Sequence, residues 1–265
     1  MAEIAEKAER LRALHVPGDP LLLVNAWDAA SARTVAALPG CHAVATASWS
    51  IAAAHGVPDG EALDRAAMIA AVRTIASSVD LPVTADLERG YGDEPRDVAE
   101  TIAMAIDAGA VGANLEDGTA GAERPLAAVA SHARKVRVAR GRADAEGVAF
   151  VINARTDVFL RGAGGVDEAL ERGRAYAEAG ADCIFVPGVR DPEVIAALVA
   201  GLPIGMSVLA TPAGPSLEEL AGLGVARISL GPGSMGVALA ALQRAAETVL
   251  ARGELPADLA FRPGT

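Results

Sequence analysis

Short apolar runs alternate along the chain with longer segments whose apolar residues recur at helical spacing. The apolar runs are 21–25, 42–48, 82–88, 112–117, 149–157, 183–188, 203–209 and 227–231. Helical spacing is found in 61–78, 94–108, 123–140, 167–179, 191–200 and 233–251. Alternating strands and helices predict a parallel sheet with helical crossovers. Eight such units without a long linker predict a closed α/β barrel, the (β/α)₈ or TIM-barrel fold.

The same rhythm recurs at several helix-to-strand junctions, as in 105–115, 176–186 and 220–230. In each, a glycine follows the helix and permits a left-handed cap before the next strand. With no domain boundary in sight, we expect residues 1–265 to form one barrel with a short N-terminal helix and a C-terminal tail. The last helix, 233–251, is apolar over a wide face, which packs either on the barrel wall or on another subunit.

Composition narrows the classes of partner. The net charge of −11 argues against nucleic-acid binding, which needs a basic face toward the phosphates. Cys41 and Cys183 form neither a disulfide framework nor a zinc-binding spacing. The N-terminal residues lack a signal-peptide core, and no apolar run is long enough to span a membrane. We therefore expect a cytoplasmic protein that binds neither nucleic acid nor membrane.

Polar side chains gather where four predicted strands end. They are Ser48 and Trp49 with Asp59 in the following loop, Asp86 with Glu88, Asn114 with Glu116, and Asn153 with Arg155. Barrel strands end at a common mouth, where catalytic groups lie. Because residues two apart on a strand point the same way, these side chains are expected to converge on one pocket.

Three acids at this mouth, Asp86, Glu88 and Glu116, outnumber its single arginine, Arg155. Buried carboxylates need compensation, and a divalent cation would supply it. Because the candidate ligands are all oxygens, Mg²⁺ or Mn²⁺ is favoured over Zn²⁺. We expect Arg155 to bind an anion rather than to form a structural ion pair.

Other polar residues of the chain can be interpreted without a catalytic role. Asp117 and Asp157 could equally be structural, as helix N-caps or solvated rim residues, or belong to the functional set. Tyr91 stands between two glycines in a predicted tight turn and could place its hydroxyl over the pocket. The only lysines, Lys7 and Lys135, fall in the N-terminal segment and in a helix, away from the strand ends, which argues against Schiff-base chemistry.

Four motifs together resemble the isocitrate lyase/phosphoenolpyruvate mutase superfamily. They are NAWDAASAR (25–33), PVTADLERGYG (82–92), GANLEDG (112–118) and VINARTD (151–157), in matching order and spacing. The resemblance implies a (β/α)₈ barrel, commonly with its last helix exchanged between subunits of a dimer or tetramer. It also implies Mg²⁺ at the mouth and a small anionic substrate with an α-keto-acid or enolpyruvate core.

The resemblance also implies roles for individual residues. Asp86 looks like the direct metal ligand, and Glu88 and Glu116 like the acids that hold the metal's waters. Asp59 looks like a further pocket acid, and Ser48 with its neighbouring amides would bind the pyruvoyl carboxylate. Trp49, Asn114 and Asn153 would complete the substrate pocket, and Arg155 would hold the substrate's carboxylate or oxyanion. Breaking a bond beside a ketone leaves an enolate, which Mg²⁺ and Arg155 would stabilise.

The loop at 117–127 departs from the superfamily. It lacks the cysteine motif of the lyases and the lysine and asparagine of the mutases, and its polar candidates are Thr119, Glu123 and Arg124. Decarboxylation needs no acid from this loop, so a Mg²⁺-dependent lyase or decarboxylase acting on an oxaloacetate-like α-keto acid is favoured. The alternatives are a phosphoenolpyruvate or phosphonopyruvate mutase or hydrolase, and a non-catalytic α-keto-acid-binding protein.

Overall fold

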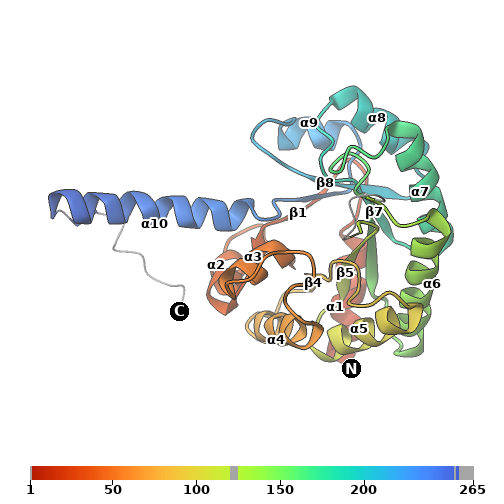
Figure 1. Cartoon of the computed structure of the whole chain (residues 1–265), viewed down its shortest axis with the longest axis horizontal. Coiled ribbons are helices and arrows are strands. Elements are labelled where there is room, and N and C mark those ends of the chain that lie inside the picture. The colour runs from red at the N-terminus through yellow and green to blue at the C-terminus, as the bar shows by residue number, and fades with distance from the viewer. Residues whose placement is uncertain (1, 120–124, 254, 257–265) are drawn as a thin grey trace.

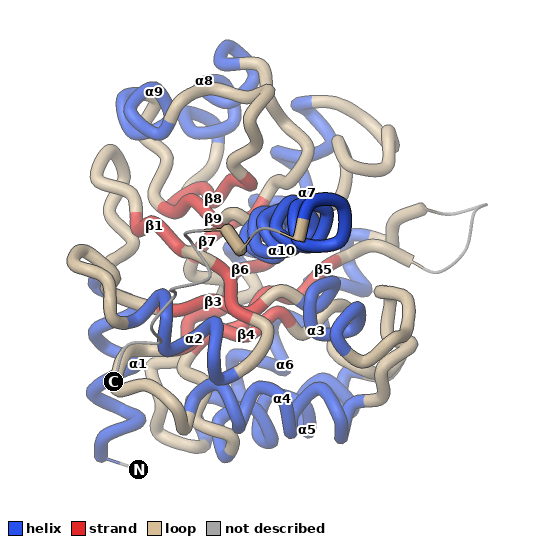
Figure 2. The backbone as a smooth tube through the Cα atoms, turned by 90° about the vertical axis from the view of Figure 1, so that its left-hand side faces the viewer, coloured by secondary structure: helices blue, strands red, loops and turns tan. Residues whose placement is uncertain are grey.

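Nine parallel strands form the centre of the fold in the computed structural model, which describes residues 2–119, 125–253 and 255–256. The strands are β1 (Leu21–Leu23), β2 (Asn25–Ala26), β3 (Val44–Thr46), β4 (Val83–Asp86), β5 (Gly112–Glu116), β6 (Val151–Arg155), β7 (Cys183–Phe185), β8 (Gly205–Leu209) and β9 (Arg227–Ser229). Their order is β1-β9-β8-β7-β6-β5-β4-β3-β2. Only Val24 separates β1 from β2, so the chain itself joins the two ends of the sheet into a barrel (Figure 2).

The described residues form ten helices, most of which surround this barrel on the outside (Figure 1). They are α1 (Ala2–Ala13), α2 (Ala29–Ala36), α3 (Ser48–Ala54), α4 (Arg65–Ala76), α5 (Pro95–Asp107), α6 (Val129–Ala145), α7 (Val166–Glu178), α8 (Pro192–Gly201), α9 (Leu217–Gly222) and α10 (Gly233–Arg252). Helix α1 contacts β6 and buries Ala8 and Leu11 completely. It covers the barrel end where the strands begin, opposite the mouth.

The structure confirms the predicted TIM-barrel class, with one difference in the first strand. The apolar run 21–25 contains two short strands, because β1 pairs with β9 whereas β2 pairs with β3. The predicted left-handed caps are also present. Gly109, Gly180 and Gly224 have φ angles of 95°, 104° and 87°, values that side chains with a Cβ rarely adopt.

Helix α10 differs from the others because it projects away from the barrel (Figure 1). Its first residues contact β2, while Val237, Leu239 and Leu242 farther along are 71%, 51% and 65% exposed. An exposed apolar helix of this kind is unusual on a soluble monomer. Among the described residues, no helix combines the length and apolar character needed to cross a membrane.

Candidate active site

A cavity of about 300 Å³ opens where the strands end. Its described lining residues are Asn25, Ala47, Ser48, Trp49, Asp59, Asp86, Asn114, Arg155, Leu160, Phe185, Pro187, Leu209, Ser229, Gly231 and Pro232. We call it the reaction cavity. It collects six of the residues predicted from the sequence: Ser48, Trp49, Asp59, Asp86, Asn114 and Arg155. Trp49 forms part of its wall and remains 46% exposed.

Asp86 is the last residue of β4, and its backbone N–H donates to Thr46 Oγ1 at 2.8 Å. One carboxylate oxygen, Oδ2, accepts hydrogen bonds from Ser48 N at 3.1 Å and Ser48 Oγ at 3.0 Å. The other oxygen, Oδ1, is buried and has no hydrogen-bond partner. A bare buried carboxylate oxygen is unfavourable unless something binds it.

Asp59 lies at the rim of the reaction cavity, close enough to Asp86 for the two carboxylates to interact electrostatically. Its partial burial and the Asp86 carboxylate raise the pKa of Asp59, while a hydrogen bond with Ser48 acts in the opposite direction. Ser48 therefore links the two acids. The rim thus holds a carboxyl group that takes up a proton more readily than an isolated aspartate does.

Arg155 ends β6 and forms an ion pair with Glu116, with Nη1 2.8 Å from Oε2. Its Nε also pairs with Asp157 Oδ1 at 2.7 Å. Burial alone would lower the pKa of Arg155, but Glu116 and Asp157 raise it above its ordinary value. Burial raises the pKa of Glu116, and Arg155 opposes that rise. Arg155 therefore does form ion pairs within the protein, contrary to that part of the expectation, while its binding of an anion stays a prediction; its side chain lines the reaction cavity.

Glu88 lies two residues beyond Asp86, in a turn with unusual backbone conformations. Glu61, Glu88 and Tyr91 have φ angles of 66°, 50° and 58°, and they are the only non-glycine residues with positive φ among those the structure describes. Such conformations are strained and persist where the surroundings impose them. Glu88 Oε1 accepts from the Tyr91 hydroxyl at 2.9 Å, and Oε2 accepts from the backbone N–H of Glu61. Tyr91 therefore binds Glu88, and burial raises the pKa of Glu88 to about 7.

Asn114 and Asn153 lie opposite each other on neighbouring strands, beside Asp86. Asn153 Nδ2 donates to Asn114 Oδ1 at 2.8 Å, and Arg227 Nη2 donates to the same oxygen at 3.2 Å. Asn114 lines the reaction cavity, whereas Asn153 is 1% exposed and does not appear among the described lining residues. Arg227 was not predictable as a site residue from the sequence, because it stands at the start of an apolar run rather than at its end.

Asn25 is a further lining residue that the sequence analysis missed. Its Nδ2 donates to Thr46 O at 2.7 Å, and its Oδ1 accepts from Leu230 N at 3.1 Å. These bonds tie β2 to β3 and to the residue that follows β9, near the break at Val24. Asn25 opens the NAWDAASAR motif, and a polar residue at the end of an apolar run was the signal that could have found it.

Asp117 and Asp157 neither cap helices nor lie at the rim, so the interpretation of these acids as helix caps or rim residues is wrong. They are 1% and 0% exposed. Asp117 Oδ2 accepts from the Tyr176 hydroxyl at 2.7 Å and pairs with Arg172 Nη1 at 3.0 Å. Asp117 Oδ1 accepts from Asp157 N at 2.9 Å. The two acids therefore fix the strand ends behind the cavity.

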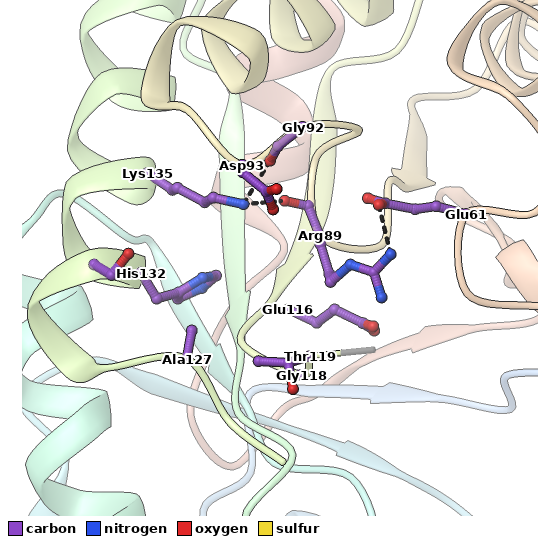
Figure 3. A pocket seen from close by; sticks show the side chains of 11 residues that line it. Glu61, Arg89, Gly92, Asp93, Glu116, Gly118, Thr119, Ala127, His132 and Lys135 are labelled. Carbon is purple, nitrogen blue, oxygen red and sulfur yellow. Dashed lines mark hydrogen bonds and ion pairs between the residues drawn. The ribbon is translucent and has the colours of Figure 1, made fainter. Parts of the chain in front are cut away.

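A second cavity of about 480 Å³ adjoins the first, and Figure 3 shows its lining side chains. Glu116 lines this cavity, so the Glu116–Arg155 ion pair lies between the two. Lys135 reaches into it from α6, and its Nζ donates to Gly92 O at 2.7 Å and to Arg89 O at 3.2 Å. Lys135 therefore does lie near strand ends, contrary to expectation. Thr119 is also part of the lining, while Glu123 and Arg124 fall outside the described residues.

The carboxylates at the mouth fit a hard divalent cation if only one of them binds it directly. Within the described residues, no three acids, histidines or cysteines lie close enough together to hold a metal ion as a cluster. Both oxygens of Glu88 accept protein hydrogen bonds, and Glu116 is paired with Arg155. Asp86 Oδ1 is the bare oxygen. One direct carboxylate, with the other acids reached through water, is an arrangement that Mg²⁺ commonly adopts.

Comparison with known proteins identifies relatives across almost the whole chain. Residues 11–250 match the family model for phosphoenolpyruvate phosphomutase. An uncharacterised protein of Mycobacterium tuberculosis is 33% identical over 249 residues, covering 94% of this chain and 92% of its own. The crystal structure of a candidate phosphonomutase from Burkholderia cenocepacia is 46% identical, with a TM-score of 0.88, and covers 95% of this chain and 100% of its own.

Two similar crystal structures contain small ligands. Oxaloacetate acetylhydrolase in complex with its product oxalate is 26% identical, with a TM-score of 0.88, and covers 98% of this chain and 92% of its own. Phosphonopyruvate hydrolase in complex with oxalate and Mg²⁺ is 25% identical, with a TM-score of 0.84, and covers 97% of this chain and 91% of its own. Their names describe reactions at different bonds, so a shared fold does not select one reaction.

Proposed function

The chain belongs to the phosphoenolpyruvate phosphomutase family, and from that premise we propose that it is a Mg²⁺-dependent enzyme acting on a small oxaloacetate-like α-keto acid. The proposed reaction is cleavage of a carbon–carbon bond, or decarboxylation, through an enolate. The isocitrate lyase/phosphoenolpyruvate mutase superfamily to which the family belongs contains lyases, mutases and hydrolases. The metal, the bond and the substrate are therefore the parts of the proposal that need support from this chain's own residues.

The observation that carries the proposal is the bare Oδ1 of Asp86 in the wall of the reaction cavity. Ser48 holds the other oxygen of that carboxylate, so Oδ1 has a fixed position in which to receive a cation. Asp86 would be the direct ligand, with Glu88 and Glu116 acting on the metal's waters. When bound, Mg²⁺ would act as a Lewis acid toward the substrate's oxygens and stabilise negative charge on them.

The remaining groups suit a small anion with two adjacent oxygen functions. Arg155 lies at one side of the cavity, and its guanidinium carbon stands over the ring of Phe185, 5.8 Å from the centroid, in a cation–π contact. Its guanidinium would stabilise the enolate oxyanion as charge develops. The Asn114 carboxamide lines the same cavity and would orient the substrate's carboxylate, while the Ser48 hydroxyl donates its single proton to Asp86. Asp59 at the rim would donate a proton to the enolate carbon after the bond to the departing carboxyl group has broken.

The small number of cationic side chains in the reaction cavity favours cleavage of a carbon–carbon bond over cleavage of a carbon–phosphorus bond. Arg155 is the one arginine or lysine among the described residues that line the reaction cavity. A phosphoryl group carries more charge than a carboxylate and is bound by several cations in most enzymes that transfer it. Arg89 and Lys135 line the adjoining cavity, but Glu61 and backbone carbonyls already accept their hydrogen bonds.

We also propose that α10 packs on a second copy of the chain, in a dimer or tetramer. Its projecting apolar face is one support. A cavity of about 570 Å³ at its base is another, because its described lining is largely apolar and comes from α2, the β2–α2 turn and the first turns of α10. Each copy thus offers both an apolar helix and an apolar groove, so exchange between two copies would bury both.

The test is thermal unfolding with oxalate and MgCl₂, added separately and together. Oxalate resembles the enolate of pyruvate, so a metal-bound enolate site should bind it. Ligand at about 100 times its Kd adds roughly 2.7 kcal/mol, a shift of several degrees in Tm. We expect the shift only when both are present, followed by turnover of oxaloacetate and no phosphate release from phosphonopyruvate. Binding without turnover of any keto acid would indicate a binding protein, and no shift would refute the metal–enolate site.

A further inference from the structure

The whole chain contains three asparagines, and all three lie inside the barrel end that forms the reaction cavity. Asn25, Asn114 and Asn153 are 4%, 9% and 1% exposed. Asn25 binds backbone groups through both its NH₂ group and its oxygen. Asn114 and Asn153 bind each other, and that pair has a property that a backbone contact lacks. Each carboxamide can present either a donor or an acceptor to its neighbour.

Left alone, the Asn114–Asn153 pair has two arrangements with the same number of hydrogen bonds. In one, Asn153 Nδ2 donates to Asn114 Oδ1, as observed at 2.8 Å. In the other, both amides are flipped and Asn114 donates to Asn153. The first leaves the Asn114 NH₂ group for the reaction cavity, and the second leaves its oxygen. Nothing within the pair itself selects between them.

Arg227 breaks this symmetry. Its Nη2 lies 3.2 Å from Asn114 Oδ1, and a guanidinium has only donors. An NH₂ group in that position would face the guanidinium donor to donor, so only the oxygen fits. In this arrangement Asn153 turns its NH₂ group toward Asn114, and its own Oδ1 is buried without a hydrogen-bond partner, as observed. Arg227 therefore selects the arrangement in which Asn114 offers a donor to the cavity.

The surroundings of Arg227 support a role beyond filling the barrel. It is 2% exposed, and the described residues provide it with no carboxylate at ion-pair distance. Its other contact is His15 Nε2 at 3.5 Å from Nη1, on a ring whose Nδ1 bonds to Leu11 O at 2.8 Å. A buried guanidinium held by neutral acceptors is expensive for the fold. An apolar residue at this position would fill the barrel at lower free-energy cost.

We propose that Arg227 is a positioning residue for the reaction cavity, which fixes the Asn114 carboxamide with its NH₂ group toward the substrate. A donor there attracts a carboxylate or an oxyanion, whereas the flipped oxygen would repel it beside Asp86. The inference rests on the proposed function only in naming an anionic substrate. The orientation of Asn114 is a property of the protein without ligand and can be measured separately.

The binding test uses oxalate with saturating MgCl₂ and calorimetric titration of four variants of the full chain. Arg227→Met removes the donors and keeps an unbranched side chain, and Arg227→Gln keeps polarity but can both donate and accept. We expect each to weaken oxalate binding about tenfold, as for a lost hydrogen bond to a charged group. Arg227→Lys remains donor-only and should recover part of the affinity. Arg140→Met, a structural arginine paired with Asp182 outside the barrel, should lower Tm without changing oxalate affinity.

A double-mutant cycle tests whether Arg227 acts through Asn114. Asn114→Ala should weaken oxalate binding about as much as Arg227→Met does. The double variant should be no weaker than Asn114→Ala alone, because the orientation of a missing side chain has no effect. Full additivity of the two losses would show that Arg227 affects the ligand by another route and would overturn the proposal. If Arg227→Met fails to fold, the Gln and Lys variants carry the same comparison.

The ligand-free test is an NMR spectrum of protein labelled with ¹⁵N only in asparagine, which shows three side-chain NH₂ pairs. Arg227→Gln should shift or broaden the Asn114 pair, assigned by its loss in Asn114→Ala, and leave the Asn25 pair unchanged. An unchanged Asn114 pair would overturn the inference whatever the oxalate result. If Arg227→Gln shifts the Asn114 pair but the wild-type protein binds no oxalate, the proposed function is refuted and the positioning role stands.

Discussion

At the residue scale, the acids of the mouth differ in what their oxygens bind. Glu88 accepts hydrogen bonds on both oxygens, and Glu116 shares its charge with Arg155. Asp86 is held through Oδ2 alone, with Oδ1 bare and buried. Because the residue type is similar in all three cases, the difference comes from their neighbours. It makes Asp86 the carboxylate that can bind a cation without first giving up a protein partner.

The Asp86→Ala variant tests this assignment. We expect it to keep a native far-UV spectrum and to lose the increase in Tm that oxalate and Mg²⁺ together produce. The variant removes an unpaired buried oxygen but leaves the Ser48 N–H and hydroxyl without their acceptor, so the Tm without ligand should fall modestly. Asp107→Ala, an exposed aspartate paired with Arg73, is the matched control and should keep the full increase. An Asp86→Ala protein that still responds to Mg²⁺ would remove Asp86 from the metal site.

His132, which is not one of the proposed metal ligands, gives a prediction for how the stability of the fold depends on pH. Burial lowers the pKa of His132 to about 4, and the ring packs edge-on against Tyr176 at 4.7 Å. Between pH 6.5 and 4 the unfolded chain therefore binds more protons at this residue than the native state, so stability falls as pH falls. Relative to His132→Gln, the wild type should lose about 2 kcal/mol of unfolding free energy between pH 8 and pH 5.

Urea unfolding of both proteins at the two pH values makes this measurement. The other buried groups are common to both proteins, so their contributions cancel in the difference. Equal losses in wild type and His132→Gln would mean that His132 is charged in the native state.

At the scale of elements, the turn between β4 and α5 holds two of the three strained residues of the site, Glu88 and Tyr91. Lys135 on α6 binds the carbonyls of Arg89 and Gly92, and so ties this turn to the neighbouring helix. Gly92 lies against the first turn of α5, where an added Cβ would stand 2.3 Å from Asp97 Cβ. That atom is fixed to the helix backbone, so the turn itself would have to move.

Gly92→Ala should therefore destabilise the protein by roughly 1–3 kcal/mol, the usual range for overpacking. The moved turn should also weaken oxalate binding, because Glu88 belongs to it. Gly141→Ala is the control from a neighbouring element. Gly141 lies inside α6 with nothing within 4 Å of an added Cβ, so alanine should stabilise the helix by roughly 0.5–1 kcal/mol. Denaturant unfolding of both variants would refute the packing argument if the two shifts had the same sign.

The elements themselves were largely predictable from sequence, for a physical reason. Parallel strands buried on both faces are nearly continuous apolar runs, so β3 to β9 each fell inside a predicted run. The break at Val24 was not predictable, because it reflects pairing with β9 on one side and β3 on the other. Pairing partners more than 200 residues apart leave no local mark in the sequence.

At the scale of the whole molecule, barrel closure brings His15, Asn114 and Arg227 together. The acids at strand ends could be found in the sequence because polar residues stand out where an apolar run stops. Arg227 could not be found in this way. It lies on β9 and binds Asn114 across the barrel on β5, and these two strands are not neighbours in the sheet. The same holds for Lys135, whose helix position was correct but whose reach to the β4–α5 turn depends on the packing of α5 against α6.

The projecting helix α10 gives a prediction for the assembly. Leu239 and Leu242 are 51% and 65% exposed and lie one turn apart, so they belong to one side of the helix. If α10 docks on a second copy, the variant carrying both Leu239→Asp and Leu242→Asp buries two charges in that contact, and the assembly should dissociate. Light scattering after size exclusion should then change from a multiple of 26.7 kDa to 26.7 kDa. Gln243→Asp, an exposed polar position of α10, should leave the mass unchanged.

Whether the barrel of the dissociated variant stays folded and binds oxalate shows whether α10 serves assembly alone or also supports the barrel. Because only the first residues of α10 contact β2, a monomeric barrel should still unfold cooperatively and bind oxalate with Mg²⁺. The apolar groove at the base of α10 would then be exposed and should bind a hydrophobic dye that the wild type excludes. A wild-type protein that is itself monomeric would refute the exchange, and it would leave the exposed leucines of α10 without a partner from this chain.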